Sequence, residues 1–155
     1  MRLVKFLSFS AAHYLENYDG KCANLHGHTW MVQVKIDWDT FYSFAHNVNN
    51  GMLVDFSLIK DRIINRFDHT TLNDVIKINP TAENLSAIMC LDLMLSIRFD
   101  VNTIIIVRLF ESATSYIEIN NTQAIYWLDV PIKDAEKSSD KIKILTKFMG
   151  EKIWK

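Results

Sequence analysis

The chain has 155 residues and a mass of 18.0 kDa, the size of one ordinary domain. Hydrophobic residues make up 49% and charged residues 23%, which is enough apolar material for a packed core. The net charge of -1 offers no basic surface to nucleic acid, and no apolar run is long enough to cross a bilayer. We therefore expect a cytoplasmic protein without nucleic-acid or membrane partners. Two cysteines, Cys22 and Cys90, do not form a disulfide framework.

The first part of the chain predicts two strands. Residues 2–13 are rich in β-branched and aromatic side chains and predict a strand that ends near His13. Residues 29–38 are the clearest strand, because large apolar side chains alternate there with polar ones. A polar connection follows, and Asn-Asn-Gly-Met at 49–52 resembles a tight turn.

Two helices are predicted in the middle of the chain. Ser57 is a candidate N-cap for a helix over 58–67. Thr81, directly after a proline, is a candidate N-cap for a second helix that extends to about Arg98. Glu83 places a negative charge in the first turn of that helix, where the helix dipole favours it.

The remaining elements complete an α+β pattern. Apolar runs separated by short polar turns predict strands at 103–112, 115–119 and 124–130. Strands followed by helices and then by strands predict helices on one face of an antiparallel sheet. The composition changes at Pro131, and apolar residues at helical spacing then predict a C-terminal helix that Gly150 would end early.

One group of candidate functional residues contains three histidines and a cysteine. His26 and His28 lie two apart, so on a strand both project to the same side, and an antiparallel neighbour would bring His13 alongside. Three imidazoles with an open fourth position are typical of catalytic zinc, whereas Cys22 as a fourth ligand would close a structural site. The residues alone leave both interpretations open.

Further candidates are weaker. Asp68 beside His69 fits either a general base with its orienting carboxylate or a solvated loop. Glu111 follows an apolar strand, where a carboxylate is either a surface residue or an anchor for the guanidine-like edge of a heterocycle. His46 lies in a polar loop and Cys90 in an apolar stretch, and we assign neither a function.

Six motifs in a fixed order carry a resemblance to a known family. Over about residues 1–129, the chain resembles the 6-pyruvoyl-tetrahydropterin synthase family, and within it the 6-carboxytetrahydropterin synthases of queuosine biosynthesis. The most specific feature is Cys-x-x-x-His-Gly-His with a Phe-Ser-Ala-Ala-His before it and an Asp-His after it. The motifs are FSAAH (9–13), KCANLHGH (21–28), GMLVDFSLIK (51–60), FDHTTLN (67–73), PTAEN (80–84) and VRLFES (107–112).

The resemblance implies the tunnelling fold (T-fold). In this fold two helices cover one face of a four-stranded antiparallel sheet, and subunits join their sheets into a barrel. It implies a T-fold domain over 1–130, a tail over 131–155 outside the family pattern, and a homo-oligomer (trimer or hexamer) with sites at subunit interfaces.

The resemblance also implies a reaction. A zinc-dependent carbon-oxygen lyase of this type converts 7,8-dihydroneopterin triphosphate to 6-carboxy-5,6,7,8-tetrahydropterin, with loss of triphosphate and acetaldehyde. Carried over by position, the family's functional residues are the zinc ligands His13, His26 and His28, the proton-transferring thiolate Cys22, its relay partners Asp68 and His69, the pterin anchor Glu111, and Thr81 and Glu83 near the pterin pocket.

Some features depart from the family or leave alternatives open. Tyr14 stands where many members have a basic residue, and Lys21, Lys35 and Arg108 are candidates for triphosphate contacts only by charge. A 6-pyruvoyl-tetrahydropterin synthase is the nearest alternative, and a non-catalytic structural zinc module is a second. A third is a family member whose tail recruits a partner.

Overall fold

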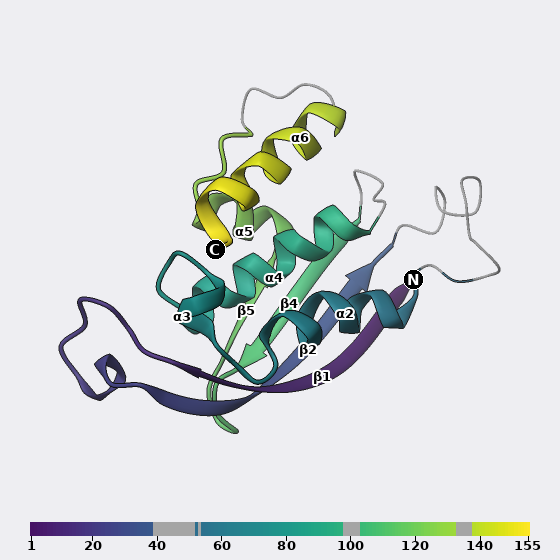
Figure 1. The fold of residues 1–155 in the computed structure, drawn as a ribbon. Helices are drawn as coiled ribbons and strands as arrows, with labels where there is room; N and C mark the ends of the chain where they lie inside the picture. The colour runs from purple at the N-terminus through teal and green to yellow at the C-terminus, as the bar shows by residue number, and fades with distance from the viewer. Residues whose placement is uncertain (39–51, 53, 98–102, 133–137) are drawn as a thin grey trace.

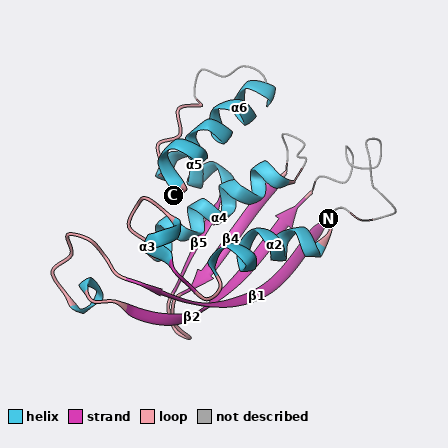
Figure 2. Cartoon of the chain, viewed as in Figure 1, coloured by secondary structure: helices cyan, strands magenta, loops and turns pink. Residues whose placement is uncertain are grey.

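Five strands form one sheet, and helices cover only one of its faces (Figures 1 and 2). The computed structural model describes residues 1–38, 52, 54–97, 103–132 and 138–155. The strands are β1 (Arg2–His13), β2 (His26–Asp37), β3 (Thr70–Thr71), β4 (Ile104–Phe110) and β5 (Tyr116–Asn120), in the sheet order β3-β1-β2-β4-β5. All neighbours are antiparallel except β3, a two-residue strand parallel to β1. The sheet thus has the predicted four antiparallel strands and one short addition.

The helices form two layers on the sheet. The first layer contains α2 and α4, and α6 lies on the far side of α4 from the sheet (Figure 1). The helices are the 3-10 turn η1 (Lys21–Ala23), α2 (Phe56–Phe67), α3 (Leu72–Val75), α4 (Ala82–Ser96), α5 (Asn121–Trp127), α6 (Ser138–Phe148) and the π-helical turn η2 (Met149–Ile153). Among the described helices, none is long and apolar enough to span a membrane.

The pairing of β1 with β2 places the apolar face of the sheet under the helices. Alternate residues of β1 point to one face, and Phe9 and His13 are buried there. The register sets Phe9 opposite Trp30 and His13 opposite His26, so the apolar face ends in histidines. Burial of the strands therefore fixes which way these histidines point.

Helix α4 is buried and mostly apolar because other elements cover it on two sides. Every residue from Leu85 to Leu93 is buried, with the sheet on one side and α5 and α6 on the other. A helix that is buried all round needs no polar face. Its start agrees with the sequence prediction, since the Thr81 hydroxyl accepts from the amide of Asn84 at 3.2 Å.

The predictions at 124–130 and at Ser57 are wrong. Residues 124–130 do not form a strand, because Asn120 and Gln123 form a capping box that begins α5 at Asn121. Packing of α5 on α4 then outweighs the strand preference of its branched and aromatic side chains. The N-cap of α2 is Asp55 rather than Ser57, whose amide donates to the Asp55 carboxylate at 2.8 Å.

The C-terminal residues pack onto the rest of the chain. Leu145, Met149 and Ile153 are each at most 2% exposed. Gly150 does not end the helix as expected, because the chain continues there as the π-helical turn η2. The division into a domain over 1–130 and a separate tail stays a prediction. His46 and, apart from Met52, the turn predicted at 49–52 lie outside the described residues.

Replacing Leu145 by alanine should lower the free energy of unfolding by about 2–5 kcal/mol, because removing the buried leucine side chain leaves a cavity between α6 and α4. Ile142 lies on the same helix with 55% exposure, and Ile142→Ala is the matched control, expected within about 0.5 kcal/mol of the parent. Urea denaturation measures both. Equal effects would contradict the packing of α6 as part of the core.

Candidate functional site

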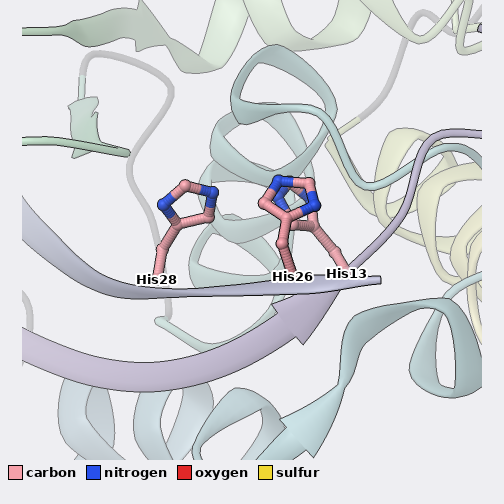
Figure 3. A group of neighbouring side chains, drawn as sticks. All are labelled: His13, His26 and His28. Atoms are coloured by element: carbon pink, nitrogen blue, oxygen red, sulfur yellow. The ribbon is translucent and has the colours of Figure 1, made fainter. Parts of the chain in front are cut away.

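Three histidines lie together at one end of the sheet. His13 is the last residue of β1, and His26 and His28 are in the first three positions of β2. Figure 3 shows the three rings on the same side of the paired strands. One ligand atom from each lies within 4.8 Å of the others, and the ring centroids are 4.5 to 5.2 Å apart. This spacing allows all three to share one metal ion.

Two backbone carbonyls orient these rings. Nδ1 of His13 lies 2.7 Å from the Pro80 carbonyl oxygen, and Nδ1 of His26 lies 2.7 Å from that of Asn24. Since a carbonyl can only accept, the proton is assigned to Nδ1 in both rings and Nε2 keeps its lone pair. Burial lowers the pKa of His13, with the Pro80 bond acting in the opposite direction. His13 is therefore held neutral, as a metal ligand must be.

The unpaired nitrogens fit a metal ion. Nε2 of His13 and Nε2 of His28 are buried and have no hydrogen-bond partner among the described residues. A buried polar atom without a partner is unfavourable, and a metal bond to its lone pair removes that penalty. Imidazole suits zinc and several other transition metals. The three histidines thus form a candidate metal site.

Glu111 faces the same site. Its Oε1 lies 3.6 Å from Nε2 of His13 and 3.7 Å from Nε2 of His28, and its side chain is 38% exposed. The carboxylate is therefore beside the two unpaired nitrogens and still reachable from solvent. Of the two interpretations that the sequence allowed, this position favours a ligand-contacting role over an isolated surface residue.

Cys22 is not part of the histidine group. It lies half-buried on η1, in the loop between β1 and β2, and its backbone carbonyl accepts from the Leu15 amide at 2.8 Å. Its sulfur is therefore not among the atoms that lie within 4.8 Å of one another. This arrangement favours the open three-histidine site over a closed site with a sulfur ligand.

Asp68 and His69 lie along the outer edge of β1. The Ser10 amide donates to Asp68 Oδ1 at 2.9 Å, and the His69 amide donates to the Ser10 carbonyl at 2.7 Å. Nε2 of His69 is 3.7 Å from Asp68 Oδ2, while the His69 side chain is 85% exposed. His69 also has a φ of 57°, a conformation that non-glycine residues rarely adopt. His28 and His69 line one open pocket, and Cys22 is not in its lining.

The other predicted residues fall into two groups. Thr81 and Glu83 are at the start of α4, and Thr81 directly follows Pro80, whose carbonyl accepts from His13. Lys35 and Arg108 both contact Glu118 at 2.8 Å on the uncovered face of the sheet, and Lys21 is exposed on η1. The ion pairs favour a surface role for Lys35 and Arg108.

Two asparagines near the site were not identified from the sequence. Asn73 donates to the Tyr14 carbonyl and accepts from the Tyr14 amide, at 2.9 and 3.0 Å. Asn79 makes the same pair of bonds with Glu16, at 2.9 and 2.7 Å. They hold the chain just after His13, and no spacing in the sequence indicates such long-range contacts.

Fold and site together define an α+β protein with a candidate three-histidine metal site at the end of its sheet and a carboxylate beside it. Over residues 2–122 the chain matches the family described as 6-pyruvoyl tetrahydropterin synthase, and it belongs to this family. This confirms the resemblance seen in the motifs.

Curated relatives carry a more specific name. A 6-carboxy-5,6,7,8-tetrahydropterin synthase of Haemophilus influenzae is 40% identical over 77 residues, which are 47% of this chain and 52% of the relative. The chain thus spans about half the length of that protein. A Rickettsia bellii protein of the same name is 27% identical over 147 residues, covering 77% of this chain and 99% of the relative.

A solved structure supports the fold. The Caenorhabditis elegans 6-pyruvoyl tetrahydropterin synthase superposes with a TM-score of 0.57 at 22% identity, over 77% of this chain and 94% of the other. The expected α+β tunnelling fold is therefore confirmed. The part of the chain beyond residue 122 lies outside the family match.

Replacing His26 by alanine should weaken binding of Co²⁺, used as a spectroscopic probe, by more than about 100-fold, because even outer hydrogen-bond partners of metal ligands contribute about 10- to 100-fold. His69→Ala is the matched control and should retain Co²⁺ binding, since His69 is outside the group. Both variants should stay folded by circular dichroism. Unfolding of His26→Ala would instead support a structural metal module.

Proposed function

We propose that the chain converts 7,8-dihydroneopterin triphosphate to 6-carboxy-5,6,7,8-tetrahydropterin, with loss of triphosphate and acetaldehyde, as a zinc-dependent carbon-oxygen lyase of queuosine (7-deazapurine) biosynthesis. The observation that carries the proposal is the group His13, His26 and His28, two of whose Nε2 atoms are buried without partners in the described chain. Relatives named 6-carboxy-5,6,7,8-tetrahydropterin synthase, at 36% to 43% identity over parts of the chain, support this choice of reaction.

The metal and the Glu111 carboxylate bind different parts of the substrate. A zinc ion on the three histidines would supply Lewis acidity to the hydroxyl groups of the substrate side chain. Glu111 binds the amino-pyrimidine edge of the pterin, because a carboxylate accepts two parallel N–H bonds. Its carboxylate lies within 3.7 Å of His28, so the pterin ring and its side chain are bound side by side. Thr81 and Glu83 border this pocket.

Cys22 is the base that takes a proton from a side-chain carbon. A thiolate near a cation is an effective nucleophile and base at neutral pH. The turn η1 that carries Cys22 ends three residues before His26, the first residue of β2. His69 exchanges the proton with the thiol, and Asp68 orients the imidazole from 3.7 Å.

Assembly brings these groups together. The His69 side chain is 85% exposed, and Cys22 does not line the pocket that His69 shares with His28. A second copy of the chain would supply the missing partner of each. The protein is therefore a homo-oligomer, a trimer or hexamer in which sheets join into a barrel. Since the thiol must stay reduced, a reducing compartment such as the cytoplasm suits this role.

Two other functions make different predictions. A 6-pyruvoyl-tetrahydropterin synthase would use the same residues but yield 6-pyruvoyl-tetrahydropterin without acetaldehyde. A structural zinc module would leave Asp68, His69 and Glu111 without a role, and loss of the metal would unfold it.

Incubation with Zn²⁺ and 7,8-dihydroneopterin triphosphate should release acetaldehyde and 6-carboxy-5,6,7,8-tetrahydropterin, both measured by mass spectrometry. Cys22→Ala should abolish turnover and keep the metal, because the sulfur acts on a proton and does not bind zinc. Cys90→Ala is the matched control and should stay active, since burial raises the pKa of Cys90 and keeps it a thiol. A pyruvoyl product would identify the sister activity, and a metal-free Cys22→Ala would make the thiol a ligand.

Mixing two inactive variants tests the shared site. Cys22→Ala and His69→Ala should each be inactive alone, and unfolding and refolding them together should recover part of the activity. Recovery is expected because hybrid oligomers contain some sites in which both groups are intact. Two Cys22→Ala preparations, mixed in the same way, are the control. No recovery in the hybrid would mean that each chain builds its own site.

A further inference from the structure

The last three residues of the chain lie against two segments that lead to the site. Ile153, Trp154 and Lys155, here named the C-terminal clasp, are outside the family match over 2–122. We propose that the C-terminal clasp is a positioning element that holds His13 on one side and the Asp68–His69 pair on the other. The roles of those residues rest on the proposed function, while the contacts of the clasp do not.

The first set of contacts joins the clasp to the segment over 73–80. The Lys77 amide donates to the Ile153 carbonyl at 2.8 Å, and the Lys155 amide donates to the Val75 carbonyl at 3.1 Å. These bonds form an antiparallel bridge between Ile76 and Trp154, and the Lys155 ammonium donates to the Asn73 carbonyl. The backbone of the segment is thus fixed from outside the family domain.

The same segment holds the metal ligand. Asn73 and Asn79 bond the backbone of Tyr14 and Glu16, the first and third residues after His13. The Pro80 carbonyl accepts from Nδ1 of His13 at 2.7 Å and so sets the direction of Nε2. Because outer hydrogen-bond partners set the orientation of a metal-bound imidazole, a shift of this segment changes the metal site.

The second set of contacts joins the clasp to the end of α2. The Arg66 guanidinium lies 4.0 Å from the centroid of the Trp154 ring, and the Phe67 ring lies 6.2 Å from it. Asp68 follows directly, caps α2 and accepts from the Ser10 amide. Trp154 thus packs against the two residues that precede the proposed proton-relay pair.

The contacts of the C-terminal clasp favour a positioning role over a purely stabilising one. Helix α6, with its buried Leu145, already attaches the C-terminal region to α4, whereas the clasp reaches α2 and the segment 73–80. The C-terminal clasp therefore restrains both the segment that holds His13 and the segment that leads to Asp68 and His69. A purely stabilising tail would not need contacts with both α2 and the segment 73–80.

Lys155→Met and Trp154→Ala test the clasp. We expect amide hydrogen exchange to accelerate at residues 14–16 in both, and at His69 in Trp154→Ala, because the restraints on these backbone bonds are lost. Co²⁺ affinity should fall by about tenfold, the lower end of what outer partners of metal ligands contribute. Trp154→Phe should restore exchange and affinity, since a ring remains for Arg66 and Phe67.

Two control variants separate positioning from stability. Lys143→Met removes an exposed lysine of α6 and should behave as the parent. Leu145→Ala lowers global stability within the same region and should leave Co²⁺ affinity unchanged. Parent-like exchange and Co²⁺ affinity in both clasp variants, or an equal loss of affinity in Leu145→Ala, would overturn the proposal.

The exchange data also keep this proposal independent of the proposed function. If the parent chain binds no Co²⁺, the metal function fails, and faster exchange at 14–16 and 69 still decides whether the clasp restrains these residues. If Co²⁺ binds and the clasp variants match the parent, the proposal for the clasp is wrong and the proposed metal site is supported.

Discussion

The register between β1 and β2 is the constraint on which the candidate metal site depends. It sets His13 opposite His26 and places His28 two residues further along the same face. A shift of one residue would turn one of the two strands over, separating the histidines and exposing Phe9 or Trp30. Since the core holds these aromatic rings, with Trp30 at 0% exposure, the energy that forms the core also aligns the ligands.

Orientation of the ligands comes from a second source, the backbone that surrounds them. Carbonyls of Pro80 and Asn24 fix the proton of the His13 and His26 rings. The buried Nε2 atoms of His13 and His28 lie near Glu111. Other groups with proposed chemical roles, Cys22 and His69, lie outside this rigid region. The chain thus combines a preorganised candidate metal site with these more exposed groups.

Much of this fold follows from patterns within short stretches of sequence. Alternation predicted β1 and β2, and the cap at Thr81 predicted the start of α4, because these depend on neighbouring residues. The grouping of His13 with His26 and His28 followed from strand periodicity. The strand predicted at 124–130 failed, because a capping box and packing on α4 decided that segment. Its side-chain composition alone favoured the wrong structure.

By itself, the sequence determined the α+β class, the family motifs and the three histidines, because alternation, caps and spacing are local. Only the tertiary structure decided that Glu111 faces those histidines and that Asn73 and Asn79 hold the chain after His13. It alone placed the C-terminal residues against α2. These contacts join residues 59 or more positions apart, and such pairs have no fixed spacing in the chain. They form only when the strands and helices pack.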